Sequence, residues 1–181
     1  MPTRFRSKAA RNAGKATRPR DAIALLRADH AKVTELFGQF EKARDDSRKQ
    51  KLAIQICNEL KVHMTIEEEI FYPTVRGVLP KEKDLLDEAA VEHASAKDLI
   101  AQIEAGGPED DKWEAKVMVL SEYIKHHVKE EHNEMFPKVR KTNLDLRELG
   151  QRLAMRKQQL AGNEPKAARL VDRMSSLEPH V

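Results

Sequence analysis

A histidine followed four residues later by a glutamate occurs twice in this sequence, each time inside a longer repeated pattern. The two copies are HMTIEEEIFYPTVR over residues 63–76 and HVKEEHNEMFPKVR over residues 127–140. Positions i and i+4 project from the same face of an α-helix, so each His–Glu pair can reach one point in space. Neutral imidazole and carboxylate are ligands that iron, zinc or manganese accepts. A single pair of this kind would more often lie solvated on a surface, but the repeat favours a metal site.

The composition indicates an all-α protein around these motifs. The 181 residues include only 7 Gly and 8 Pro, few aromatic residues, and many Ala, Leu, Glu and Lys. The single cysteine, Cys57, excludes an internal disulfide and fits a reducing compartment, and we predict that it is buried. No apolar run reaches the roughly 18 residues of a transmembrane helix. Residues 1–20 also lack the apolar core of a secretory signal, so we expect a cytoplasmic protein.

The positive charge of the chain is concentrated at its start. Residues 1–20 contain seven Arg and Lys and no acid, and since the total is +3, residues 21–181 carry 3 − 7 = −4. This stretch has little to bury and is predicted to be a basic disordered arm. Such an arm could hold nucleic acid through its phosphates, although its near lack of aromatic residues favours a solvated extension.

Apolar residues at steps of three and four predict four helices between residues 21 and 141, which short connections fold into an up-down-up-down bundle. The second helix should kink or end near Pro73, and the fourth should open at Pro108. An additional helix is predicted over 142–161, where leucines on one face could lie across the bundle or bind a partner (Leu146, Leu149, Leu153, Leu160). Residues 162–181 are predicted to be a loose tail.

Each predicted helix carries one histidine on its apolar stripe. In an antiparallel bundle these positions all fall about 14–18 Å from the same end, at roughly 1.5 Å per residue. One interior layer would then contain His30, His63, Glu67, His93, His127 and Glu131. A buried hydrogen-bonded network is the alternative, but two carboxylates in a core repel each other, and metal cations remove that problem. We therefore predict a metal site, and we expect His126 and His132, which lie off the stripes, on the flank or surface.

These residues, followed by Tyr72-Pro73 and Phe136-Pro137, resemble the hemerythrin-like HHE cation-binding family over residues 21–141. The resemblance implies a four-helix bundle around a non-haem di-iron centre, with two iron ions (Fe²⁺/Fe³⁺) joined by an oxo or hydroxo bridge. It also implies that Glu67 and Glu131 bridge the irons and that the four histidines are terminal ligands.

The sequence departs from the oxygen-carrying members at two positions. Lys97 stands where they have a second histidine, and the last helix offers His-xxx-Glu, with His132 where they have aspartate. The pattern is similar to the H-HxxxE-H-HxxxE branch, linked to iron or oxygen sensing and to peroxide or nitric-oxide handling. This ligand set would leave two positions open on octahedral irons. Glu59 and Tyr123, each one turn before a ligating histidine, could occupy one, but we rather expect them to support or pack against the ligands.

Two functions stay open at this point. The first is a di-iron protein that binds, senses or transforms O₂, peroxide or NO, and the sequence leaves open whether it consumes peroxide as a catalase-like enzyme. The second is an iron- or oxygen-responsive binding module that signals to a partner without turnover, through the basic arm or residues 144–160.

Overall fold

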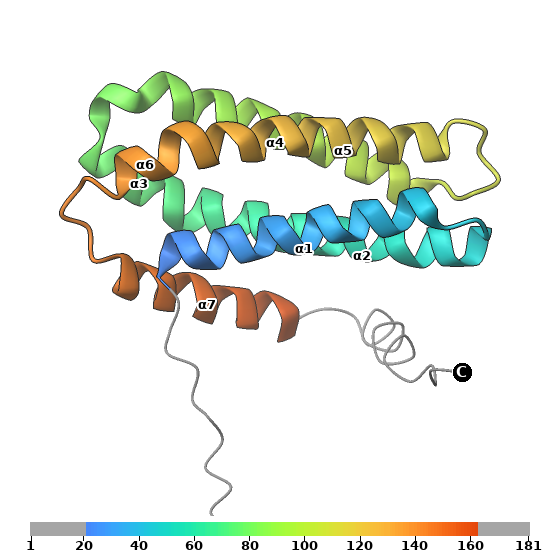
Figure 1. The fold of residues 1–181 in the computed structure, drawn as a ribbon, viewed down its shortest axis with the longest axis horizontal. Helices are drawn as coiled ribbons and strands as arrows, with labels where there is room; N and C mark the ends of the chain where they lie inside the picture. Colours follow the sequence, from blue (N-terminus) through green and yellow to red (C-terminus); the bar gives the residue numbers. More distant parts are fainter. Residues whose placement is uncertain (1–20, 163–181) are drawn as a thin grey trace, which may run out of the picture.

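A computed structural model describes residues 21–162, in which helices are the only regular secondary structure and no β-strand occurs (Figure 1). Four helical rods run antiparallel as an up-down-up-down bundle, which confirms the predicted all-α fold. The rods are α1 (Ala22–Lys42); α2, η1 and α3 (Asp46–Ile66, Glu67–Phe71, Tyr72–Val78); η2 and α4 (Pro80–Glu82, Lys83–Ala105); and α5, η3 and α6 (Trp113–Glu130, Glu131–Met135, Phe136–Val139). The predicted basic arm and the predicted tail beyond Gly162 lie outside the described residues.

Aspartates begin the first two rods. The Asp21 carboxylate accepts a hydrogen bond from the Ala24 amide at 2.8 Å, and Asp45 accepts one from Arg48 at 2.8 Å. These bonds satisfy amides that have no partner within the helix. The acidic caps thus set where α1 and α2 start.

The fourth rod begins later than the sequence suggests. Residues 108–112 form turns instead of helix, and α5 starts at Trp113. The Trp113 side chain is 1 % exposed, and its indole N–H donates to the Ile103 carbonyl at 3.0 Å. Since a buried indole needs a hydrogen-bond acceptor, this contact ties the start of α5 to the end of α4.

Both HxxxE rods contain a π-helical turn that begins at the glutamate. In η1 the Tyr72 amide donates to the Glu67 carbonyl, and in η3 the Phe136 amide donates to the Glu131 carbonyl. The prolines, which have no N–H, follow directly where the α-helix resumes. The predicted kink or end near Pro73 therefore takes the form of a wide turn, and the helical path continues to Val78.

Two apolar clusters fill the bundle, one on each side of the histidine layer. The first contains Phe40, Leu60 and Ile100, and the second contains Leu26, Phe71 and Phe136. Cys57 lies in the first cluster at 1 % exposure, and burial raises the pKa of its thiol to about 12. Its side chain is therefore an inert part of the core, as predicted.

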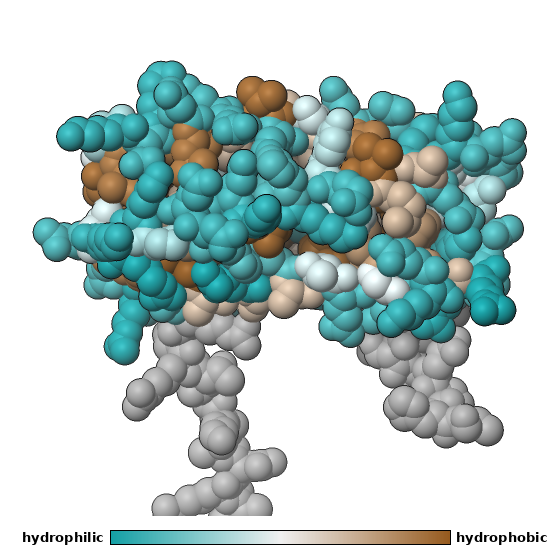
Figure 2. Space-filling view, turned by 45° about the horizontal axis from the view of Figure 1, so that its top comes forward, coloured by the Kyte–Doolittle hydropathy of each residue, from teal (hydrophilic) through white to brown (hydrophobic). Residues whose placement is uncertain are grey.

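The additional helix α7 (Leu146–Gly162) packs on the outside of the bundle, alongside α1 and α2 (Figure 1). Leu149 and Leu153 are 3 % and 0 % exposed and join the second cluster. The leucine face thus covers the bundle. The face of the molecule in Figure 2 is mostly hydrophilic with scattered apolar residues, and none of the helices in residues 21–162 has the length and hydropathy to span a membrane.

Candidate metal centre

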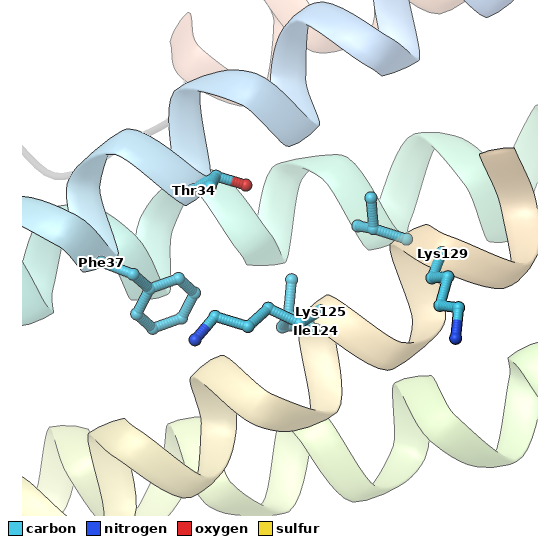
Figure 3. Close-up of a pocket in the computed structure, with 6 residues that line it drawn as sticks. Thr34, Phe37, Ile124, Lys125 and Lys129 are labelled. Carbon is cyan, nitrogen blue, oxygen red and sulfur yellow. The ribbon is translucent and has the colours of Figure 1, made fainter.

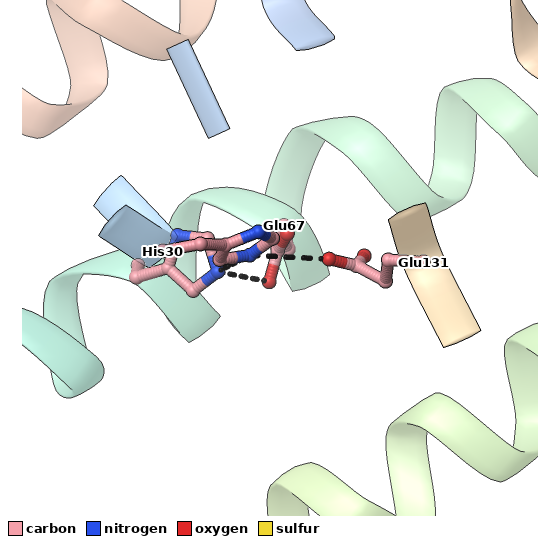
Figure 4. A group of neighbouring side chains, drawn as sticks. His30, Glu67 and Glu131 are labelled. Atoms are coloured by element: carbon pink, nitrogen blue, oxygen red, sulfur yellow. Dashed lines mark hydrogen bonds and ion pairs between the residues drawn. The ribbon is translucent and has the colours of Figure 1, made fainter. Parts of the chain in front are cut away.

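The six predicted ligands meet in one buried layer, with side chains contributed by all four rods. None of them exceeds 4 % exposure. Their ligand atoms form two groups in which all atoms lie within 4.8 Å of one another: His30, His63, Glu67 and Glu131; and Glu67, His93 and His127. Figure 4 shows His30, Glu67 and Glu131 pointing toward one another. Glu67 belongs to both groups, whereas Glu131 belongs to the first alone.

The imidazole Nε2 atoms point inward in pairs. Those of His30 and His63 lie 2.9 Å apart, and those of His93 and His127 lie 3.2 Å apart. Each histidine of the first pair also has a carboxylate oxygen close by, Glu67 Oε2 at 3.1 Å from His63 Nε2 and Glu131 Oε2 at 3.2 Å from His30 Nε2. Two nitrogens and two oxygens thus lie within 4.8 Å of one another, and this is a donor set that a cation accepts.

Several polar atoms in this layer have no hydrogen-bond partner. Both Glu67 oxygens and Glu131 Oε2 are buried without one. A buried unpaired polar atom costs about 1–3 kcal/mol, and more if it is charged. A cation held between imidazole and carboxylate would satisfy these atoms, so the residues present fit metal ions.

Without a cation, the buried glutamates and histidines of this layer have strongly shifted pKa values. Burial and the Glu131 charge raise the pKa of Glu67 to about 7. Burial also acts to raise the pKa of Glu131, but the His30 imidazole, whose Nε2 lies 3.2 Å from Oε2, and the charge of His127 outweigh it and lower the pKa to about 2. Burial acts to lower the pKa of His63, while Glu67 and Asp29 raise it to about 10. The metal-free centre therefore holds a proton on His63, which a metal ion would have to displace.

Each inward-pointing histidine faces a polar side chain at its other ring nitrogen, Nδ1. Glu68 lies 3.0 Å from His93, Glu92 lies 2.8 Å from His127, His132 lies 2.9 Å from His30, and the more distant Asp29 lies 3.7 Å from His63. Such partners orient an imidazole and select the tautomer that leaves Nε2 free for a metal. The sequence analysis did not identify these contacts and expected His132 on the flank or surface.

A sequence signal for these partners does exist. Asp29 and Glu92 each directly precede a seam histidine, while Glu68 and His132 each directly follow a seam glutamate. Each pair occupies equivalent places in the two halves of the bundle. His30 thus has a histidine as its partner, whereas the other three inward-pointing histidines each have a carboxylate. The two halves therefore differ in charge outside the ligands.

Tyr72 is a further residue of the centre that the sequence analysis used only as part of a signature. Its hydroxyl donates to Glu131 Oε1 at 3.1 Å and lies 3.4 Å from Nε2 of both His93 and His127. The equivalent residue in the other half is Phe136, whose ring stacks on His30 at 6.0 Å. One half of the centre therefore carries a phenol that can donate a proton, and the other carries an apolar ring.

Other residues singled out in the sequence lie outside the layer. Glu59 pairs with Lys32, Tyr123 is 49 % exposed, and within residues 21–162 neither forms a hydrogen bond or ion pair with a predicted ligand. Lys97 donates to both oxygens of Glu68 at 2.6 Å and thereby supports the carboxylate that faces His93. Its effect on the centre is therefore indirect.

A small apolar cavity of about 10 Å³ adjoins the four histidines, with room for a molecule the size of water. Ile124 and Val128 line this cavity and also line a surface pocket of about 160 Å³ between α1 and α5. Figure 3 shows that pocket, with Phe37 on one side and Lys125 and Lys129 on the other. Two apolar side chains thus form the wall between the solvent-facing pocket and the histidine layer.

Comparison with known proteins agrees with this architecture. The chain is 30 % identical over 118 residues to a DNA nickase from Nostoc sp., a match that covers 64 % of this chain and 32 % of that protein. The chain therefore spans about a third of that relative's length. A crystal structure of a hemerythrin HHE cation binding domain-containing protein from Mycobacterium kansasii superposes with a TM-score of 0.68, covering 79 % of this chain and 88 % of that one. At 23 % identity this likeness shows the fold alone.

The family model named Hemerythrin HHE cation binding domain matches residues 21–139, the range that contains all four rods and both repeated motifs. Its cation-binding description agrees with the buried His and Glu clusters. This chain is a member of the hemerythrin HHE cation binding domain family.

Proposed function

We propose that this chain is a non-haem di-iron protein that senses or transforms O₂ or a peroxide. The observation that carries the proposal is the pair of buried ligand groups that share Glu67. Imidazole and carboxylate together suit iron. When bound, an iron pair would supply one-electron redox chemistry and attract a small oxygen-containing ligand.

The protein's own residues then have distinct tasks. The four histidines and two glutamates would hold the metals, and the polar side chains at Nδ1 keep the imidazoles oriented. The Tyr72 hydroxyl is a proton donor in contact with the predicted ligands, and Glu131 accepts its hydrogen bond. Burial and the Glu131 charge raise the pKa of Tyr72, so the phenol keeps its proton at neutral pH.

The cavities support a small ligand rather than an organic substrate. The space beside the histidines is about 10 Å³, which suits a diatomic molecule or peroxide only after slight movement of its walls. Ile124 and Val128 separate it from the surface pocket, so a small uncharged molecule would pass more easily than a hydrated ion. Val128→Phe should therefore slow the response to peroxide without changing the metal content, whereas Val128→Ala should not slow it.

The test begins with protein purified from iron-supplemented cells. We expect two irons per chain by elemental analysis, and a visible spectrum that changes when peroxide is added. Peroxide consumption measured on the same sample distinguishes turnover from stoichiometric sensing. A count well below two irons, or a spectrum that peroxide leaves unchanged, would refute the proposal.

A second candidate is a metal-dependent switch, and the contacts of α7 favour it. The Lys157 ammonium lies 2.5 Å from Asp29 Oδ1, while the other oxygen of Asp29 faces His63 at 3.7 Å. Arg156 pairs with Glu69 in the π turn that begins at Glu67. Metal occupancy could thus be transmitted from ligand-bearing segments to α7, and from there to a protein partner.

Hydrogen exchange distinguishes the two functions. If the protein is a switch, amides in residues 144–160 should be less protected in the metal-free form than in the loaded form. Lys157→Ala should remove that difference while leaving the metal count unchanged. Exchange in α7 that does not depend on metal, together with peroxide consumption, would favour the enzyme.

A further inference from the structure

A second His-xxx-Glu pair lies on α5, one residue before the buried one. His126 and Glu130 share the outer face of the helix, with His126 Nε2 3.2 Å from Glu130 Oε1. Glu92 of α4 reaches the same place, and its Oε1 lies 3.7 Å from His126 Nε2. The ligand atoms of these three residues all lie within 4.8 Å of one another. The motif and its α4 partner thus repeat the buried arrangement at the surface, because each residue directly precedes one of the predicted ligands.

The surroundings of this trio favour a cation. Every ion pair of Glu92 and Glu130 within residues 21–162 is made with a histidine, so no lysine or arginine neutralises either carboxylate. Glu88 and Glu134 add negative charge next to Glu130. The His126 side chain is 62 % exposed, while those of Glu92 and Glu130 are 21 % and 24 % exposed. The imidazole of the trio is therefore open to solvent, whereas its two carboxylates are largely shielded from it.

We propose that Glu92, His126 and Glu130 form a third metal site at the surface, which takes a divalent transition metal such as Zn²⁺. One imidazole nitrogen and two carboxylate oxygens are ligands that zinc accepts, and water would complete the coordination. The site differs from the buried centre in its exposure and in having a single histidine. Its affinity should accordingly be lower, and its metal should exchange with solution.

Glu92 links this site to the buried centre. Its Oε2 lies 2.8 Å from Nδ1 of His127, a predicted ligand of the centre, while its Oε1 belongs to the surface trio. A cation on Oε1 draws negative charge away from Oε2, so Oε2 becomes a weaker hydrogen-bond acceptor for His127. Since such partners raise the basicity of a ligating imidazole, metal at the surface should weaken metal binding at the centre.

The experiment uses the full-length protein with its resident metal, dialysed against Zn²⁺ and analysed for each element separately. Wild type should take up one additional zinc per chain while retaining the resident metal. His126→Ala and Glu130→Gln should lose the additional zinc and keep the resident metal. Glu122→Gln is the matched control, because Glu122 is an exposed glutamate of the same helix and its side chain pairs with Lys125. It removes the same charge and should keep the additional zinc.

Glu92→Gln should affect both sites. The variant should lose the additional zinc, and its affinity for the resident metal should fall by about 10–100-fold, the usual effect of removing a partner of a ligating histidine. Absence of additional zinc in wild type would overturn the proposal, and so would equal losses in Glu122→Gln and Glu130→Gln. Loss of resident metal in His126→Ala would show that His126 does not belong to a separate site. The resident metal is counted in the same samples, so failure of the surface site is distinguishable from failure of the buried one.

Discussion

Three consecutive glutamates at the first π turn should respond differently to the same substitution, Glu→Gln. Glu67 is fully buried and belongs to both ligand groups. Glu68 contacts Nδ1 of His93 from outside and is held by Lys97. Glu69 pairs with Arg156 of α7. Since each substitution replaces a carboxyl group by an amide of the same shape within the same short segment, differences in metal binding must come from where each side chain points.

The expected magnitudes follow from these contacts. Glu68→Gln keeps one oxygen for His93 but loses the charge, so the loss of metal affinity should fall at the lower end of the about 10–100-fold range for such partners. Tenfold corresponds to about 1.4 kcal/mol. Glu67→Gln weakens ligation in both groups at once, so its loss should exceed that range and leave partial occupancy. Glu69→Gln should leave the metal affinity unchanged and should instead loosen α7.

Metal affinity is measured by competition with a chelator of known affinity, and the thermal unfolding temperature is recorded with and without metal. With metal in excess, stabilisation of the fold should decrease in step with the loss of affinity. Hydrogen exchange of α7 provides the separate readout for Glu69→Gln. Equal metal loss in Glu67→Gln and Glu69→Gln would refute the assignment of Glu67 to the centre, because it would show a general charge effect.

Three further predictions concern protons, the phenol and α7. Metal uptake at pH 7 should release a proton, because Glu67 and Asp29 raise the pKa of His63 to about 10. The affinity for metal should therefore rise about tenfold per pH unit for each displaced proton. Calorimetry in buffers of different protonation enthalpy measures the number of protons released. Tyr72→Phe removes a hydrogen bond to a carboxylate and should lower the free energy of unfolding by about 1.5–3 kcal/mol in urea titrations. Leu153→Ala should cost about 2–5 kcal/mol, whereas Met155→Ala, at 62 % exposure, should cost far less.

Helical periodicity is local, and for that reason the sequence by itself determined much of this protein. Steps of three and four residues predicted the helices, and antiparallel folding brought His30 and His93 to the level of the two His-xxx-Glu pairs. The structure brings these residues together in one buried layer. Their types and spacing were sufficient, because any bundle that buries the apolar stripes must also bury the histidines among them.

Contacts between helices depended on tertiary structure. His132 lies off the apolar stripe, yet its ring meets Nδ1 of His30 because α1 and the end of the fourth rod approach closely there. Tyr72 points into the centre because the π turn at Glu67 rotates the residues that follow it, a rotation that regular α-helical spacing does not predict. The leucines of α7 indicated an apolar face but not the surface that it covers. Only the packed bundle, with Asp29 placed to meet Lys157, decided where that helix lies.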